Sequence, residues 1–177
     1  MILAPLPHNE KQRLQALRDL LILDTPPEER FDRISAFAAK EFDVPMALVS
    51  LVDRDRQWFK SEVGMGVRET PIDASICAHA ILGTQPLIVE DTYNDLRFHD
   101  NPVVINNPQI RFYAGQPLFS EEGQPLGTLC LIDPAPRQLS NKQLRLFIDM
   151  ATLVEGYLKL RQLSAQTAQL RAALRAD

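Results

Sequence analysis

The fold is decided by RFYAGQPLF at residues 111–119, SEEGQ at residues 120–124 and PLGTLCLID at residues 125–133. The two outer segments have the apolar, β-favouring composition of strands. The polar segment between them contains Gly123, and a hairpin turn often needs a residue that tolerates positive φ. This stretch therefore predicts two antiparallel strands joined by a short turn.

Other strands are predicted by their apolar pattern. Residues 46–52 read MALVSLV, which is apolar at odd and even positions alike, as in a central strand covered on both faces. Gly64 to Pro71 is expected to be a loop, and Glu90 to Gln109 a long, lid-like connection. The predicted strands are Met46–Val52, Gln57–Val63, Leu87–Val89, Arg111–Leu118 and Gly127–Ile132.

Helices are expected to flank these strands. Asn9 and Gln12 have the spacing of a capping box, and Ser140 is a candidate N-cap of a long final helix. After residue 158 the apolar positions of that final helix adopt the 3-4 spacing of a coiled coil. The predicted helices begin near Asn9 and Ser140 and cover Pro27–Phe42 and Asp73–Leu82, the last one ended by Gly83.

The order and spacing of several motifs resemble the GAF domain family. These are DASICAHAI at residues 73–81, PLIVED at 86–91, DLRF at 95–98, Asn-Pro at 101–102 and the hairpin. They are most similar to the GAF domains that open bacterial sensor histidine kinases and cyclic-di-GMP signalling proteins. The resemblance covers roughly residues 23–137. It implies an α+β fold, a GAF-like central antiparallel sheet of five to six strands, with terminal helices on one face and loops plus a short helix on the other.

Composition narrows the function classes. The 177 residues are 45% hydrophobic and 24% charged, with a net charge of −4, so no affinity for nucleic acid is expected. Arg54, Arg56 and Lys60 are interpreted as a solvated surface. The sequence has no membrane span and no signal peptide, and its two cysteines fit a reducing compartment, so a cytoplasmic location is predicted.

Cys77 and His79 could form a nucleophile–base pair or two metal ligands. On a helix, however, positions i and i+2 point about 200° apart. The favoured interpretation is that Cys77 packs inward and His79 faces outward or caps. Thiol sensing by Cys77 and a free methionine sulfoxide reductase using Cys77 and Cys130 are the alternatives, the second on the model of another branch of the family.

Candidate pocket residues come from the strands and the lid. Trp58 and Tyr113 combine an apolar body with a polar group, and Arg111 could hold an anionic ligand. Each also has a structural interpretation: core packing for the aromatic residues, and for Arg111 an ion pair with Asp91 or Asp95. The ligand-pocket candidates are Trp58, Cys77, His79, Asp91, Arg111 and Tyr113. The bilin and cyclic-nucleotide signatures of the family are not recognised, no metal-binding cluster is seen, and the cofactor is unknown.

The chain is expected to comprise a flexible N-terminus (residues 1–8), a GAF domain (9–158) and a coiled-coil-like helical extension (159–177). The leading hypothesis is a non-enzymatic sensory module that binds a small molecule or forms a homodimer through its terminal helices. It would relay a signal through the final helix to an output domain, such as a histidine kinase or diguanylate cyclase, in the same polypeptide or a partner chain.

Overall fold

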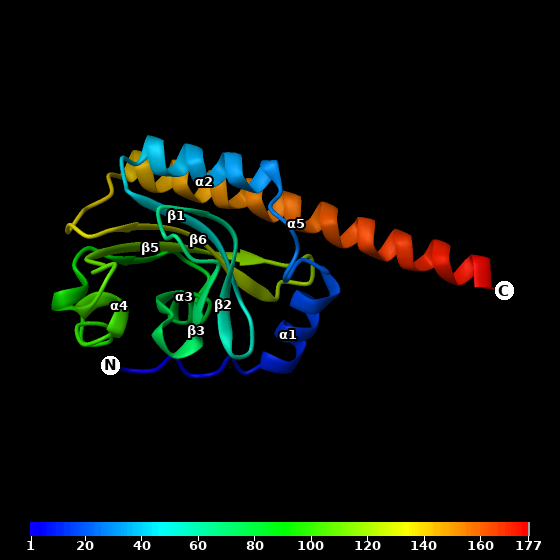
Figure 1. The fold of residues 1–177 in the computed structure, drawn as a ribbon, viewed down its shortest axis with the longest axis horizontal. Coiled ribbons are helices and arrows are strands. Elements are labelled where there is room, and N and C mark those ends of the chain that lie inside the picture. Colours follow the sequence, from blue (N-terminus) through cyan, green and yellow to red (C-terminus); the bar gives the residue numbers. More distant parts are fainter. Residues whose placement is uncertain (177) are drawn as a thin grey trace.

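A computed structural model describes residues 1–176 and contains one six-stranded sheet (Figure 1). The strand order is β3-β2-β1-β6-β5-β4, and every neighbouring pair is antiparallel. The strands are β1 (Met46–Val52), β2 (Arg56–Val63), β3 (Glu69–Pro71), β4 (Leu87–Val89), β5 (Phe112–Phe119) and β6 (Pro125–Asp133). The predicted α+β class and the central position of β1 are confirmed. β3 lies where a loop was expected, and its three residues are too few for a sequence pattern.

Two long helices cover one face of the sheet, short helices and loops cover the other, and one helix stands at its end. The α-helices are α1 (Glu10–Asp19), α2 (Glu29–Glu41), α3 (Ile76–Ala80), α4 (Pro102–Ile105) and α5 (Asn141–Ala176). Two 3₁₀ turns, η1 (Ile72–Ala74) and η2 (Thr92–Asn94), complete the set. α2 and α5 lie side by side over one face, whereas α3, α4 and the connecting loops lie on the other (Figure 1). α1 stands across the end of the sheet, and its Leu17 and Leu20 join the core beneath α2 and α5.

The two faces of the sheet bury two separate apolar cores. Along β1, Ala47, Val49 and Leu51 pack towards the helical face, while Leu48 and Val52 pack towards the loop face. This alternation is the period-2 geometry of a strand. It explains why β1 is apolar at nearly every position and why it occupies the middle of the sheet.

The β5–β6 hairpin forms as predicted. Gly123 has φ +77°, the conformation that favours glycine, and the Ser120 amide donates to the Gln124 carbonyl across the turn (2.9 Å). At the start of α5, the Ser140 hydroxyl accepts from the Gln143 amide while the Gln143 side chain accepts from the Ser140 amide. A capping box therefore begins α5.

α1 begins where expected, but its predicted capping box was wrong, and so was the predicted start of the helix at Asp73. Asn9 precedes α1, but its side chain makes no cap and instead contacts the Gln124 side chain. The helix expected from Asp73 is divided at Ser75, whose backbone is extended and whose hydroxyl accepts from the Ala78 amide. Because Ser75 acts as the N-cap, residues 72–74 form η1 and α3 begins only at Ile76.

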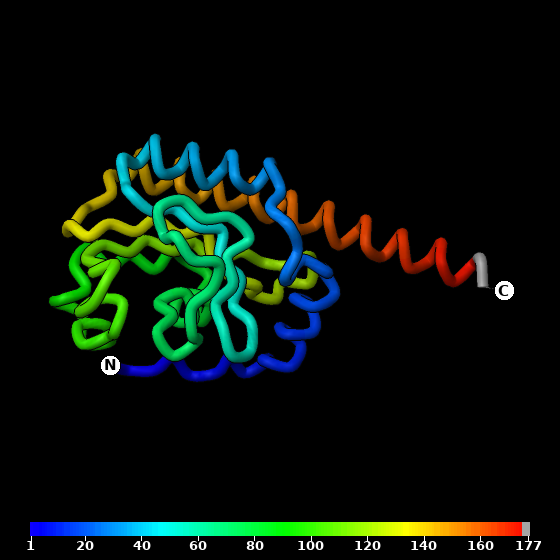
Figure 2. Tube along the Cα trace, in the orientation of Figure 1, coloured from blue at the N-terminus to red at the C-terminus, as the bar shows by residue number. Residues whose placement is uncertain are grey.

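The N-terminal segment, residues 1–8, runs in extended form along the loop side of the molecule (Figure 2). The Ile2 amide donates to the Arg97 carbonyl (3.2 Å), and the Ile2 carbonyl lies 3.0 Å from Nε2 of His79. The segment thus has defined contacts with α3 and the lid, and its flexibility stays a prediction. None of the described helices is long and apolar enough to cross a bilayer.

Candidate functional site

The six ligand-pocket candidates do not converge on one site. Trp58 packs into the core of the helical face, on the opposite side of the sheet from the loops. His79 lies near the N-terminal segment, edge-on to Phe98. Two pairs among them meet: Asp91 with Arg111 in the lid, and Cys77 with Tyr113 in the core of the loop face.

Asp91 and Arg111 form a bidentate ion pair in the lid, with both N–O distances 2.7 Å. The same Asp91 caps η2 by accepting from the Tyr93 amide, and the Arg111 guanidinium lies 3.9 Å from the centre of the Tyr93 ring. The hydrogen bond from Arg111 lowers the pKa of Asp91. The structural interpretation of Arg111 is therefore confirmed for its partner Asp91: this pair fixes the lid to the start of β5.

A thiol pair lies at the centre of the loop face. Cys77 Sγ on α3 is 3.9 Å from Cys130 Sγ on β6, and both residues are at most 1% exposed. The Tyr113 hydroxyl and the Gln57 side-chain amide each donate to Cys77 Sγ at 3.1 Å. The inward packing predicted for Cys77 is confirmed, but its surroundings are polar.

Two further hydroxyls face this thiol pair. Ser50 Oγ on β1 and Thr128 Oγ1 on β6 are buried and have no hydrogen-bond partner of regular geometry among the described residues. Ser50 and Thr128 are paired across β1 and β6, and Thr128 lies two residues before Cys130, so both hydroxyls lie on the face of the sheet that carries the Cys130 sulfur. We use the name thiol chamber for Ser50, Cys77, Tyr113, Thr128 and Cys130.

Backbone geometry at Gly115 makes the chamber possible. Gly115 follows Tyr113 by two residues, so both lie on the same face of β5. A Cβ at Gly115 would lie 2.1 Å from the Tyr113 hydroxyl, which is closer than van der Waals contact allows. The absent side chain therefore lets the phenol lie along the strand and reach Cys77.

The environment of the thiol chamber shifts the pKa values of the two thiols in opposite directions. Burial raises the pKa of Cys77, but the neighbouring side chains of Cys130, Thr128, Tyr113 and Ser50 outweigh it and lower that pKa to about 7. Burial and the adjacent Cys77 raise the pKa of Cys130 well above its usual value. The two sulfurs titrate as a pair, in which one negative charge is held mainly on Cys77.

Little empty space remains beside the thiol chamber. A crevice of about 20 Å³ touches Cys77 and is lined at its outer end by the partly exposed residues Met65, Ala74 and Val103. Such a volume holds about one water-sized molecule. In this conformation the crevice beside Cys77 therefore has no room for a nucleotide or a chromophore. No three metal-binding side chains gather anywhere in residues 1–176.

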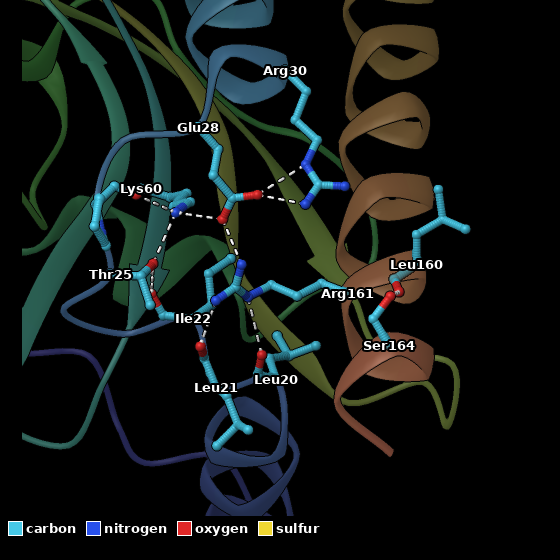
Figure 3. A network of polar contacts seen from close by, with 11 residues as sticks. Leu20, Leu21, Ile22, Thr25, Glu28, Arg30, Lys60, Leu160, Arg161 and Ser164 are labelled. Carbon is cyan, nitrogen blue, oxygen red and sulfur yellow. Dashed lines mark hydrogen bonds and ion pairs between the residues drawn. The ribbon is translucent and has the colours of Figure 1, made fainter. Parts of the chain in front are cut away.

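A second polar cluster joins α5 to the rest of the domain (Figure 3). The Glu28 carboxylate accepts from Lys60 (2.7 Å), Arg30 (2.5 Å) and Arg161 (2.5 Å). The Arg161 guanidinium also donates to the Leu20 and Leu21 carbonyls at 3.1 and 2.6 Å. Arg161 therefore ties α5 to the α1–α2 connection, and we call Glu28, Arg30, Lys60 and Arg161 the helix joint.

The solvated interpretation of Lys60 was wrong. Lys60 is fully buried, and its ammonium also donates to Thr25 Oγ1 and the Pro26 carbonyl, both at 2.8 Å. Its alternation with Trp58 placed it on the right face of β2, but the sequence does not reveal that the α1–α2 connection covers it. No pattern in the sequence indicates that Glu28 or Arg161 lies near Lys60. Because a buried lysine needs an acidic partner, the burial of Lys60 would have been the signal for one.

Beyond the helix joint, α5 leaves the domain as a single continuous helix. Gln162 is its last buried residue and bonds to Glu122, so contacts with the domain extend slightly past the expected boundary at residue 158. Four leucines on this last part of α5, from Leu160 onwards, are on the surface. The exposed stripe comprises Leu160, Leu163, Leu170 and Leu174, which are 50–79% exposed.

A family model and a known protein both resemble this chain in sequence. The family model described as GAF domain matches residues 26–158. A cyclic di-GMP phosphodiesterase of Pseudomonas aeruginosa is 42% identical over 155 residues, covering 87% of this chain but only 26% of the relative.

Two solved structures illustrate the shared fold. A domain of a two-component sensor histidine kinase from Sinorhizobium meliloti has a TM-score of 0.56 at 16% identity, covering 84% of this chain and 97% of its own. A free methionine-R-sulfoxide reductase from Neisseria meningitidis, solved with its substrate, has a TM-score of 0.60 at 16% identity, covering 95% of this chain and 98% of its own.

Proposed function

Because the chain belongs to the GAF domain family, a signalling and sensory family found in kinases and cyclic-di-GMP proteins, we propose that it is a regulatory module that pairs with a second copy and relays a signal through α5. The observation that carries this proposal is the exposed stripe on a helix that is firmly held at its base. The chain spans about a quarter of its phosphodiesterase relative. An output domain in the same polypeptide is therefore part of the proposal, with cyclic-di-GMP turnover as the favoured output.

The stripe has the spacing of a coiled-coil seam. Leu160, Leu163, Leu170 and Leu174 are separated by three, seven and four residues, with Thr167 at the intervening position. Such a seam needs a partner helix, since four exposed leucines in a row would otherwise remain in water. A parallel second copy presents the same stripe at the same height, and it directs both C-terminal ends towards their output domains.

The apolar surface continues onto the domain body. Phe37 on α2 and Leu153 on α5 are 52% and 50% exposed and line a groove between these helices together with Ile34, Met150 and Tyr157. This groove adds contact area near the base of the seam. We therefore expect the domain's own helices to contribute most of the dimer's stability.

Ligand control of this relay would require movement on the loop face. A small molecule larger than water can reach Cys77 only if α3 or the lid moves away from the sheet, because the crevice beside Cys77 holds about 20 Å³. We propose a binding role without catalysis. The alternative, a thiol-dependent reductase, is favoured by the 3.9 Å separation of Cys77 and Cys130. Turnover of free methionine sulfoxide with dithiothreitol, lost in Cys77→Ser, would establish that alternative.

Sedimentation tests the relay proposal. Leu163→Glu with Leu170→Glu should raise the dimer dissociation constant at least tenfold, since burying one leucine contributes about 1.5–3 kcal/mol. The matched control is Gln169→Glu with Ala172→Glu, which adds the same charge at exposed positions on the side of the helix away from the seam. Circular dichroism should be nearly unchanged in both. A wild-type protein that is monomeric at high micromolar concentration would refute the proposal.

A further inference from the structure

We propose that Cys77 and Cys130 form a reversible disulfide in which Cys77 is the thiol attacked first and Cys130 the resolving thiol, with a small hydroperoxide as oxidant. The inference rests on the geometry of the thiol chamber and is independent of the proposed relay. The two sulfurs belong to segments 53 residues apart, yet they lie 3.9 Å from each other. The sequence contains no other cysteine.

The first reason for this assignment is the polar shell around Cys77. Tyr113 and Gln57 donate to its sulfur. The Ser50 and Thr128 hydroxyls, which lack hydrogen-bond partners within residues 1–176, lie opposite each other on β1 and β6, on the face that carries Cys130. A buried inert thiol would need none of these donors, and leaving buried hydroxyls unpaired is unfavourable. Donors directed at sulfur stabilise the thiolate, which is the reactive form of cysteine.

The second reason is selective access. The crevice at Met65, Ala74 and Val103 reaches Cys77 but is not lined by Cys130. Its volume of about 20 Å³ suits a molecule close to water in size, such as hydrogen peroxide. Larger alkylating reagents do not fit unless the lid opens.

The chemistry balances in two steps. The Cys77 thiolate attacks one peroxide oxygen and breaks the O–O bond, which gives a sulfenic acid at Cys77 and hydroxide. The Cys130 thiol then attacks Cys77 Sγ, the S–O bond breaks, and one water leaves with the Cys130 proton. Together two thiols and one hydrogen peroxide give one disulfide and two waters.

Disulfide formation would move α3. The sulfur–sulfur distance must shorten from 3.9 Å to about 2.05 Å, so α3 is drawn towards β6. α3 also carries His79, which contacts the N-terminal segment at Ile2. Oxidation would therefore tighten the loop face against the sheet, and reduction would release it.

The test treats the reduced protein with hydrogen peroxide, denatures it, alkylates all remaining thiols and measures the intact mass. The expected product has lost two hydrogens, carries no alkyl group, and returns to two alkylated thiols after dithiothreitol. In Cys130→Ser, Cys77 should instead accumulate as a sulfenic acid, which a dimedone probe traps when it is added together with the denaturant. In Cys77→Ser, Cys130 should stay reduced.

Tyr113→Phe provides the control that retains the fold and both cysteines. It removes one donor to Cys77, so disulfide formation at pH 7 should slow about tenfold, as expected for a lower thiolate fraction. Before denaturation, iodoacetamide should label wild-type Cys77 slowly. The proposal is overturned if the wild type keeps both thiols after peroxide, if it forms only intermolecular disulfides, or if Cys130→Ser and wild type give the same oxidised product.

Discussion

Replacement of Glu28 by glutamine should destabilise the domain more than removal of its buried partner Lys60. Glu28→Gln keeps the size of the side chain but removes the negative charge that three cations share. Lys60 is fully buried, so its ammonium would retain only the neutral Thr25 hydroxyl and Pro26 carbonyl. Breaking a buried ion pair from one side costs about 3–5 kcal/mol.

Partial exposure reduces that cost. The Glu28 side chain is 21% exposed, so in Glu28→Gln water can solvate part of the positive charge that the carboxylate had paired with. We expect Glu28→Gln to lower the free energy of unfolding by about 2–3 kcal/mol, which corresponds to about 5–10 °C in Tm for a domain of this size. Lys60→Met removes the buried charge itself and leaves Glu28 with Arg30 and Arg161. That variant should lie within about 1 kcal/mol of wild type.

Urea denaturation followed by circular dichroism at pH 7 measures both variants under identical conditions. The decisive quantity is the order of their stabilities, because a cost from side-chain packing alone would make the larger change, lysine to methionine, the worse one. If Glu28→Gln loses less than about 1 kcal/mol, or if Lys60→Met is the less stable variant, the charge-sharing account of the helix joint is wrong.

Two further predictions concern the loop face. Gly115→Ala should lower the free energy of unfolding by about 2 kcal/mol in urea titrations, because its methyl group would displace the Tyr113 hydroxyl. The same substitution at Gly156 on α5, where a Cβ would meet nothing within 4 Å, is the control and should not destabilise. For His79, burial lowers the pKa despite the hydrogen bond with the Ile2 carbonyl, so the folded protein binds fewer protons than the unfolded chain near pH 6.5. The free energy of unfolding of wild type relative to His79→Gln should therefore be greatest above pH 6.5 and fall as the pH decreases towards 5. A difference between the two proteins that is constant across this range would refute a lowered pKa of His79 in the folded protein.

Much of the sheet could be predicted because its strands carry a local signal. The two-sided apolar run at Met46–Val52 requires cover on both faces, and an apolar core packs against each face of this strand. The hairpin was readable from Gly123 and its flanking apolar segments. β3 was missed because three residues cannot establish a period, and its pairing with β2 is decided by the loop that precedes it.

The site was harder to predict because it is made by contacts between distant segments. Period-2 alternation assigns a residue to a face of the sheet, but not to the segment that covers that face. Lys60 illustrates this limit: a bulge between Val49 and Ser50 interrupts the pairing opposite it, and the α1–α2 connection, over thirty residues earlier, supplies its partners. The proximity of Cys77 and Cys130 likewise depends on how α3 docks on β6.

The two faces of the central strands differ in a way that stability alone does not explain. Towards α2 and α5, β6 presents Leu129 and Leu131, and the core there is apolar. Towards the loops, the same strand presents Thr128 and Cys130, with Ser50 beside them on β1. Each unpaired buried hydroxyl costs about 1–3 kcal/mol relative to a satisfied one, so an apolar residue at these positions would favour folding. Departures from the most stable core are expected where a protein binds or reacts. The loop face, with its thiol pair, is therefore where binding or redox chemistry of this domain should be sought, while the apolar helical face holds α5 in place.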